Sequence, residues 1–238
     1  MSVKFPQQLS LGVSLNDDAT FDNFYAPELT HNAQVISALK DQLDSKRHSF
    51  IYLWGSAGCG LTHLLQAACH HAQQRNLSFQ YLPLRDLIGY APTELFAGLE
   101  SLDFVAIDGL DLLVNRPEWQ ETLFGLYNQM RDQGKRLLVC AIEGPQQLNL
   151  SLPDLRSRLQ WGLTFRVLEL DDEQKKHALQ FRAKARGLEL SDEVCSYILQ
   201  RLPRDMNELF WQLNRLDQAS LAEQRKITIP FVKKIIDL

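Results

Sequence analysis

Residues 50–62 of this sequence read Phe50-Ile-Tyr-Leu-Trp-Gly-Ser-Ala-Gly-Cys-Gly-Leu-Thr62. The first five are apolar and rich in aromatic and branched side chains, which predicts a short, buried strand of a parallel sheet. The run ends at Gly55, and from Leu61 onward apolar residues recur at helical spacing. A strand, a glycine-rich turn and a helix in this order are the setting of a phosphate-binding loop. The stretch therefore predicts an α/β fold.

The turn matches the loop pattern G-x-x-x-x-G-K-[ST] at every fixed position except one. Gly55, Gly60 and Thr62 fit, whereas Leu61 stands where the pattern has lysine. Backbone N–H groups of the turn and the helix N-terminus could still hold phosphates, because neither needs a side chain. The cation for the outer phosphates is missing. On this pattern alone, an ordinary strand-to-helix turn is an equally good interpretation.

A second strand adds to the signal. Residues 102–108 form an apolar run that ends in Asp108, which is the Walker B pattern of an aspartate that holds Mg²⁺ beside the loop hydroxyl. A turn aspartate at a strand end is the alternative, but the two signals in this order favour a nucleotide site. The next residue is Gly109, where hydrolytic enzymes usually have an acid. The following strand ends in Ala141-Ile142, which offers no polar group to a γ-phosphate.

Periodicity along the chain predicts a core followed by a helical end. Helices are expected near 29–43, from Leu61 onward, and near 93–100 and 117–133, and further strands near 79–82, 137–141 and 163–168. From Asp171 the pattern is purely helical, with Ser191 and Asp205 as N-caps. We therefore predict a peripheral tail over 1–20, an α/β core with a parallel five-stranded sheet over 21–170, and an α-helical lid over 171–238.

Composition and charge exclude several classes of protein. The net charge of −4 argues against a chain that holds nucleic acid by itself. No apolar run approaches the ~20 residues of a membrane span, and the first residues have no secretory signal. The four cysteines are scattered without metal or disulfide spacing, so we expect reduced core residues in a cytoplasmic protein. We interpret His63, His70 and His71 as surface residues rather than metal ligands.

Several segments together resemble the AAA+ proteins of the DnaA clade. The most specific is Ser157-Arg-Leu-Gln-Trp-Gly162, and the resemblance covers nearly the whole chain. A DnaA initiator would continue into a helix-turn-helix domain, whereas this sequence stops just past the lid, so no direct sequence-specific DNA binding is expected. The other segments are Gln8-Leu-Ser-Leu11, Phe21-Asp-Asn-Phe24, the loop at Gly55–Thr62, Ile107-Asp108, Leu148-Asn-Leu150 and Thr228-Ile-Pro-Phe231.

The resemblance implies a set of functional residues. Arg158 aligns with the arginine finger that AAA+ proteins extend into a neighbour's site, although two solvated surface arginines, Arg156 and Arg158, are the plainer interpretation. Thr62 and Asp108 would hold Mg²⁺. Asn207 stands where the family has its sensor 2 arginine, and Arg204, one turn earlier, is the candidate replacement. The nucleotide would contact Phe24, Tyr25, Gly55, Ala57, Gly58, Cys59, Gly60, Leu61, Thr62 and Asn207.

The same resemblance implies partners. Gln8, Leu9, Ser10 and Leu11 match the peptide with which such regulators bind the sliding clamp, the β subunit of DNA polymerase III. Gly12 departs from the bulky fifth residue of that peptide. From the residues alone, a loose N-terminal strand at the edge of the sheet is the plainer interpretation of this segment. The implied role is to stimulate ATP hydrolysis by DnaA on the DNA-loaded clamp and so to repress re-initiation of DNA replication. Self-association into a dimer is also expected.

The chain's own site is interpreted as a nucleotide-gated switch. The contacts to the γ-phosphate are absent, so we expect a nucleoside diphosphate, by default ADP with loose base selectivity, and no ATPase activity of its own. One alternative is a stand-alone AAA+ NTPase related to helicase loaders, with Asp111 or Glu143 as base. Another is an adaptor that only tethers partners to the clamp.

Overall fold

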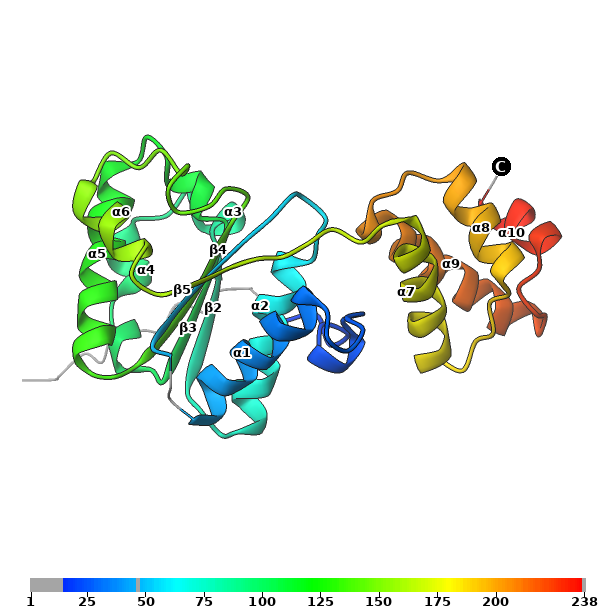
Figure 1. Cartoon of the computed structure of the whole chain (residues 1–238), viewed down its shortest axis with the longest axis horizontal. Helices are drawn as coiled ribbons and strands as arrows, with labels where there is room; N and C mark the ends of the chain where they lie inside the picture. The colour runs from blue at the N-terminus through cyan, green and yellow to red at the C-terminus, as the bar shows by residue number, and fades with distance from the viewer. Residues whose placement is uncertain (1–14, 46–47, 237–238) are drawn as a thin grey trace, which may run out of the picture.

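The computed structural model describes residues 15–45 and 48–236. Residues 8–11, which carry the predicted clamp peptide, lie outside this range. The described chain forms an α/β core and a helical lid, joined by the connection that follows β5 (Figure 1). Strands are β1 Phe50–Trp54, β2 Phe79–Pro83, β3 Phe104–Asp108, β4 Arg136–Ala141 and β5 Leu163–Arg166. Core helices are α1 His31–Ser45, α2 Leu61–Gln74, α3 Leu84–Leu87, α4 Pro92–Phe96, α5 Pro117–Asp132 and α6 Pro153–Leu159. Lid helices are α7 Asp172–Ala185, α8 Asp192–Arg201, α9 Met206–Glu223 and α10 Ile229–Ile236.

The five strands form one sheet in the order β2-β3-β4-β1-β5, and every neighbouring pair is parallel. This confirms the predicted parallel sheet. In the register, Trp54 at the end of β1 faces Ala141, and Asp108 at the end of β3 faces Cys140. The carboxyl ends of β1, β3 and β4 therefore meet at one edge. Because β1 and β2 lie on opposite sides of β3 and β4, this edge contains the crevice where open α/β sheets bind ligands.

Helices cover both faces of the sheet and bury its side chains. The helices α1 and α2 pack on one face with Ile51 and Leu53. The helices α3 to α6 pack on the other face with Tyr52 and Trp119. The central strands β1, β3 and β4 are buried on both sides, which explains why their sequences are continuous apolar runs rather than alternating ones.

One helical prediction needs correction, and one helix was missed. The helix expected near 93–100 is α4 followed by a 3₁₀ turn at Leu99–Ser101, because Gly98 adopts a positive φ of 84° between them. The helix α3, which directly follows β2, was not predicted, since four residues are too few to show a helical period.

The lid has an apolar core of its own, built from α7 to α10. Its helices begin at side-chain caps. Ser191 accepts a hydrogen bond from the N–H of Val194, and Asp205 accepts from the N–H groups of Asn207 and Glu208. These caps fix where each helix starts, and the cap at Asp205 brings the first turn of α9 toward the core. Among the described residues, no helix is long and apolar enough to cross a bilayer.

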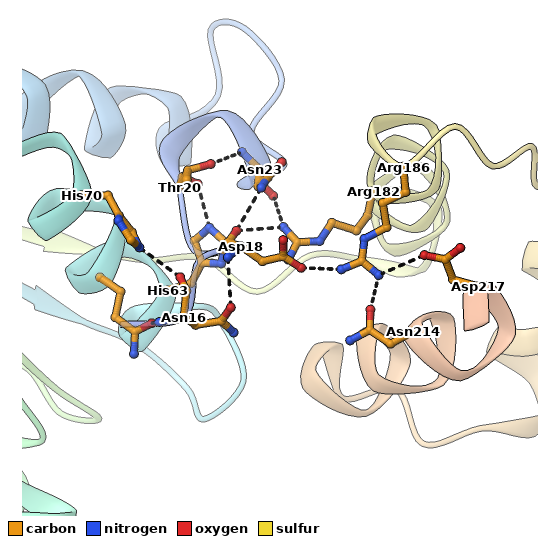
Figure 2. A network of polar contacts seen from close by, with 11 residues as sticks. Asn16, Asp18, Thr20, Asn23, His63, His70, Arg182, Arg186, Asn214 and Asp217 are labelled. Carbon is orange, nitrogen blue, oxygen red and sulfur yellow. Dashed lines mark hydrogen bonds and ion pairs between the residues drawn. The ribbon is translucent and has the colours of Figure 1, made fainter. Parts of the chain in front are cut away.

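The segment 15–23 lies between the core and the lid (Figure 2). Its first part, residues 15–20, was predicted as part of a peripheral tail, and the contacts below correct that prediction. On the core side, the N–H of Asn16 donates to Gln66 of α2, and His63 contacts the carbonyl oxygen of Thr20 at 2.8 Å. On the lid side, Asp18 pairs with Arg182 of α7. The lid is thus attached to the core at two places, by the β5–α7 connection and by this segment.

Candidate nucleotide-binding site

A cavity of about 990 Å³ opens at the carboxyl ends of β2, β3 and β4. The turn after β1, the start of α2 and the first turn of α9 complete its wall. Several predicted nucleotide-binding residues are therefore brought together in one place. Those that line the cavity are Ala57, Gly58, Gly60, Leu61, Thr62 and Asn207.

Glycine is required at three places in the loop. Gly58 and Gly60 have φ angles of 81° and 101°, which side chains rarely adopt. Gly55 is buried, and a Cβ there would lie 2.7 Å from the sulfur of Cys59. Gly55 and Cys59 thus shape the loop from beneath without lining the cavity. The loop therefore needs these glycines for its own geometry.

The amino end of α2 is open to an anion. Gly60 is its N-cap and provides no side-chain hydrogen bond to the first turn. The first N–H groups of a helix have no intrahelical acceptor, and the helix dipole favours negative charge there. A phosphate could therefore accept hydrogen bonds from the backbone of residues 58–62. The residues present fit a diphosphate.

Thr62 and Asp108 meet as the sequence suggested. The hydroxyl of Thr62 donates to Asp108 Oδ2 at 2.7 Å, and Tyr81 donates to the same oxygen at 2.8 Å. The thiol of Cys140 donates to Oδ1 at 3.0 Å. Burial, together with the negative charge of Asp108, raises the pKa of both Tyr81 and Cys140, so both remain donors at neutral pH. The described residues contain no cluster of three or more acidic, histidine or cysteine ligands.

A Mg²⁺ ion at this position would depend on a nucleotide. Mg²⁺ is commonly held by one or two protein oxygens together with substrate phosphates and water. Thr62 and Asp108 offer that kind of partial ligand set. They fit a metal that arrives with a nucleotide, and they do not fit a metal held by protein side chains alone.

The region where a γ-phosphate would lie has few polar contacts. Ala141 and Ile142 line it with apolar side chains, and Leu61 takes the place of a cation. Asp111 also lines the cavity, but its carboxylate accepts a hydrogen bond from the N–H of Ile142 at 3.2 Å. Glu143 does not line the cavity, and its carbonyl oxygen accepts from Tyr52.

Arg204 does not line the cavity. Its guanidinium lies 2.8 Å from Asp172 at the start of α7, and its side chain is largely exposed. Asn207, at the family's sensor 2 position, does line the cavity. The lid therefore presents a neutral amide there instead of a cation.

Arg85 and Asp205 are among the cavity residues that sequence reasoning missed. Arg85 on α3 is the arginine among the lining residues, and Asp205 reaches the loop so closely that its Oδ2 would collide with a Cβ on Gly58. Arg85 follows the carboxyl end of β2, which is where parallel sheets carry ligand contacts, and that position was the available signal. The lining contains more aspartates than positively charged side chains. The aspartates are Asp86, Asp108, Asp111 and Asp205.

Phe24 and Tyr25 are not in the cavity lining. The ring of Phe24 packs against Gly60 and lies 5.5 Å from the ring of His63. Tyr25 packs on the lid, with its ring 5.9 Å from that of Phe181. These residues support the loop and the lid. Among the lining aromatics are Tyr81 and Tyr90.

His63 corrects the interpretation of the α2 histidines as surface residues. Burial lowers the pKa of His63, so its ring is neutral at physiological pH and donates to Thr20. His71 is also engaged, at 2.9 Å from Asp44. Their partners lie far away in sequence, so no local pattern could predict these contacts.

Arg158 lies away from this cavity. It belongs to the last turn of α6, and the following residues lead into the amino end of β5. The cavity is at the carboxyl ends of the same parallel sheet. The guanidinium of Arg158 lies 4.3 Å from the centre of the Trp161 ring. Arg156, on the same helix, is exposed.

Comparisons with known proteins agree with this architecture. The family described as "Bacterial DnaA ATPase domain" matches residues 15–166, and "Hda, lid domain" matches residues 172–236. Domain III of the Thermotoga maritima replication initiation protein DnaA is 23% identical, with a TM-score of 0.78 over 94% of this chain and 98% of that one. AMPPCP-bound DnaA from Aquifex aeolicus is 26% identical, with a TM-score of 0.74 over 88% of this chain and 68% of that one.

A more distant structure shares the fold alone. The Holliday junction branch migration motor RuvB of Thermotoga maritima is 18% identical, with a TM-score of 0.67 over 92% of this chain and 71% of that one. The DnaA match spans the core, and the Hda match spans the lid. The chain therefore belongs to the DnaA-related AAA+ family, with a bacterial DnaA ATPase domain followed by a lid of the Hda type.

Proposed function

We propose that this chain is a nucleotide-binding regulator in the cytoplasm that acts on DnaA. Together with the DNA-loaded sliding clamp, it stimulates ATP hydrolysis by DnaA and so represses re-initiation of replication. One observation supports the proposal above all others. Arg158 lies near the amino end of β5, at the edge of the sheet opposite to the chain's own cavity, and this distance from the chain's own cavity supports a role in a neighbour's site.

The chemistry of Arg158 suits that role. Within the described residues its guanidinium forms no ion pair with a carboxylate, and its recorded contact is the Trp161 ring. A guanidinium offers a planar set of donors that matches a phosphoryl group. In the partner's site it would neutralise charge that grows on the γ-phosphoryl during transfer. Arginine fingers contribute about 10³–10⁵-fold to such rates.

The chain's own site is proposed to hold a nucleoside diphosphate, with ADP as the default and loose selectivity for the base. The amides of residues 58–62 would bind the phosphates, and Thr62 and Asp108 would hold Mg²⁺ beside them. Leu61, Ala141 and Asn207 offer no charge to a third phosphate. The phosphates of a bound nucleotide would supply a negatively charged partner for the backbone N–H groups of residues 58–62. Phosphate release by the pure protein at steady state would identify a stand-alone NTPase instead.

Clamp binding is assigned to residues 8–11, which precede the described part of the chain. An extended Gln-Leu-Ser-Leu peptide places both leucines on one side, where an apolar pocket could receive them. We also propose self-association, because the family resemblance implies a dimer.

The test of the proposal compares two arginine variants. Arg158→Ala should keep its fold, nucleotide binding and clamp binding, and should lose the stimulation of ATP hydrolysis by clamp-bound DnaA. Arg156→Ala is the matched control, because it removes an exposed arginine from the same helix. Equal stimulation by the two variants would refute the trans arginine and leave a tethering adaptor.

A further inference from the structure

Trp161 is among the exposed large side chains of the described chain, at 67% of its full exposure. Tryptophan is enriched among the residues that contribute most of the binding energy in protein interfaces. Its ring lies against the guanidinium of Arg158. The exposed aromatic and the arginine assigned to the partner's ATP are therefore a single unit.

Backbone contacts hold this unit in one geometry. The helix α6 ends in a tight turn, in which the N–H of Trp161 donates to the carbonyl oxygen of Arg158 at 3.1 Å. The neighbouring Leu159 is fully buried and anchors the turn to the core. The turn therefore places the two side chains on the same side, three residues apart.

The residue after Trp161 is fixed as well. A Cβ on Gly162 would lie 2.6 Å from the carbonyl oxygen of Phe50, so the chain passes directly over the start of β1. Phe50 is itself buried against Tyr127, with ring centres 5.1 Å apart. Trp161 is thus exposed at its ring and rigid at its backbone. Such a residue can hold the neighbouring side chain of Arg158 in position.

We infer that Trp161 is the positioning residue for Arg158. Its ring restricts the guanidinium to the orientation in which it enters the partner's site, and docking removes the pair from water, which strengthens the cation–π contact. The inference rests on the proposed function. It adds that the rate of stimulated hydrolysis depends on an aromatic face at 161, in addition to the charge at 158.

The first experiment separates rate from binding. Full-length Trp161→Leu keeps apolar bulk and removes the aromatic face; Trp161→Phe keeps a smaller face. Stimulated hydrolysis of DnaA-bound ATP is measured against regulator concentration with DNA-loaded clamp. Trp161→Leu should lower the maximal rate at saturating regulator about 2- to 30-fold. Trp161→Phe should lie between this variant and the wild type.

A matched control exists on the lid. Trp211 is 52% exposed and also carries an arginine, Arg215, at 5.0 Å from its ring centre. Trp211→Leu should leave the maximal rate unchanged. A similar loss in both leucine variants would overturn the inference, as would a Trp161→Leu variant that raises only the half-saturating concentration.

A second measurement needs no partner. In the free protein labelled with ¹⁵N-arginine, the Nε–H resonance of Arg158 is identified by its absence in Arg158→Ala. Ring current from Trp161 should shift it, and Trp161→Leu should remove that shift. An unchanged resonance would overturn the inference. If Arg158→Ala kept full stimulation, the proposed function itself would fail; if it lost stimulation and Trp161→Leu did not, only this inference would fail.

Discussion

The carboxylate of Asp18 lies 3.2 Å from the guanidinium of Arg182, and this ion pair joins the segment before the core to helix α7 of the lid (Figure 2). Asp18 also pairs with Arg186, which in turn contacts Asn214 of α9. The backbone carbonyl oxygens of Asp18 and Asn23 accept further hydrogen bonds from Arg182. This segment is therefore attached to the lid through one carboxylate, two backbone carbonyl oxygens and two arginines.

Asp18→Asn should destabilise the protein by about 1–2 kcal/mol. The Arg182 side chain is only 10% exposed and would lose its charged partner, while Asp18 is about half exposed, which moderates the cost. The free energy of unfolding in urea is the measurement. Asp17→Asn is the control, since Asp17 is exposed and should stay within about 0.5 kcal/mol of the wild type. Equal stability of the two variants would contradict the attachment.

Gly162→Ala should destabilise the fold by about 1–3 kcal/mol, because the new methyl group would press on the backbone of Phe50. It should also lower stimulated hydrolysis, because Arg158 lies in the adjoining turn. Gly125→Ala is the matched control. Gly125 lies in α5 with nothing within 4 Å of an added Cβ, and helical alanine should stabilise it by up to about 1 kcal/mol. The free energy of unfolding of each variant is measured by urea unfolding.

Asp205→Asn should bind ADP more tightly, by roughly five-fold, or about 1 kcal/mol. The substitution removes negative charge beside Gly58, where phosphates would bind, and asparagine is as good an N-cap as aspartate. The dissociation constant for ADP is measured by isothermal titration calorimetry. Asp171→Asn is the control. Asp171 is the equivalent N-cap at the start of α7 and does not line the cavity, so the affinity of this variant for ADP should not change. Weaker binding by Asp205→Asn would contradict this account. The wild type should bind ADP at least as well as ATP.

Leu9→Ala with Leu11→Ala should weaken clamp binding by at least about 100-fold, since each buried leucine contributes roughly 1.5–3 kcal/mol. Surface plasmon resonance on immobilised clamp is the measurement. Gln7→Ala, next to the peptide, should bind normally. Circular dichroism and urea unfolding should be unchanged in the double variant, and an unfolded variant would speak against a peptide separate from the core.

Asp103 predicts a dependence of stability on pH. Hydrogen bonds from the hydroxyl and N–H of Ser78, together with Lys135, lower the pKa of Asp103 to about 2 from an ordinary 3.8. The stabilisation is therefore complete above about pH 4 and is lost as the pH falls toward 2. Asp103→Asn should have a lower urea midpoint at pH 7, and the gap to the wild type should narrow by pH 2.5. Asp41→Asn, at an exposed position, should show no gap at either pH.

The elements that the sequence predicted well carry their information locally. Residues 50–54 form a strand because each is apolar, and the glycines that follow adopt the turn that their positions suggested. The features that sequence reasoning missed depend on distant partners. Asp18 meets Arg182 across 164 positions, and His63 meets Thr20 across 43. No periodicity encodes such contacts.

The candidate site was predictable to a similar degree. Thr62 and Asp108 belong to patterns of known spacing, and they meet at 2.7 Å. Asp205 was recognised as a helix cap, but its approach to Gly58 depends on how the lid is oriented. Phe24 and Tyr25 were assigned from a family pattern, and in this structure their rings pack against the loop and the lid.

The strands β1 and β5 run side by side from the turn that carries Arg158 to the loop that lines the cavity. Arg158 and the nucleotide cavity thus lie at opposite ends of the same two strands. A contact through the Arg158 end leaves the cavity end of the same molecule free. Such a contact is directional and does not close between two molecules. Under the proposed function, this protein therefore contacts its partner through the Arg158 end, and its own cavity stays open to a nucleotide while it does so.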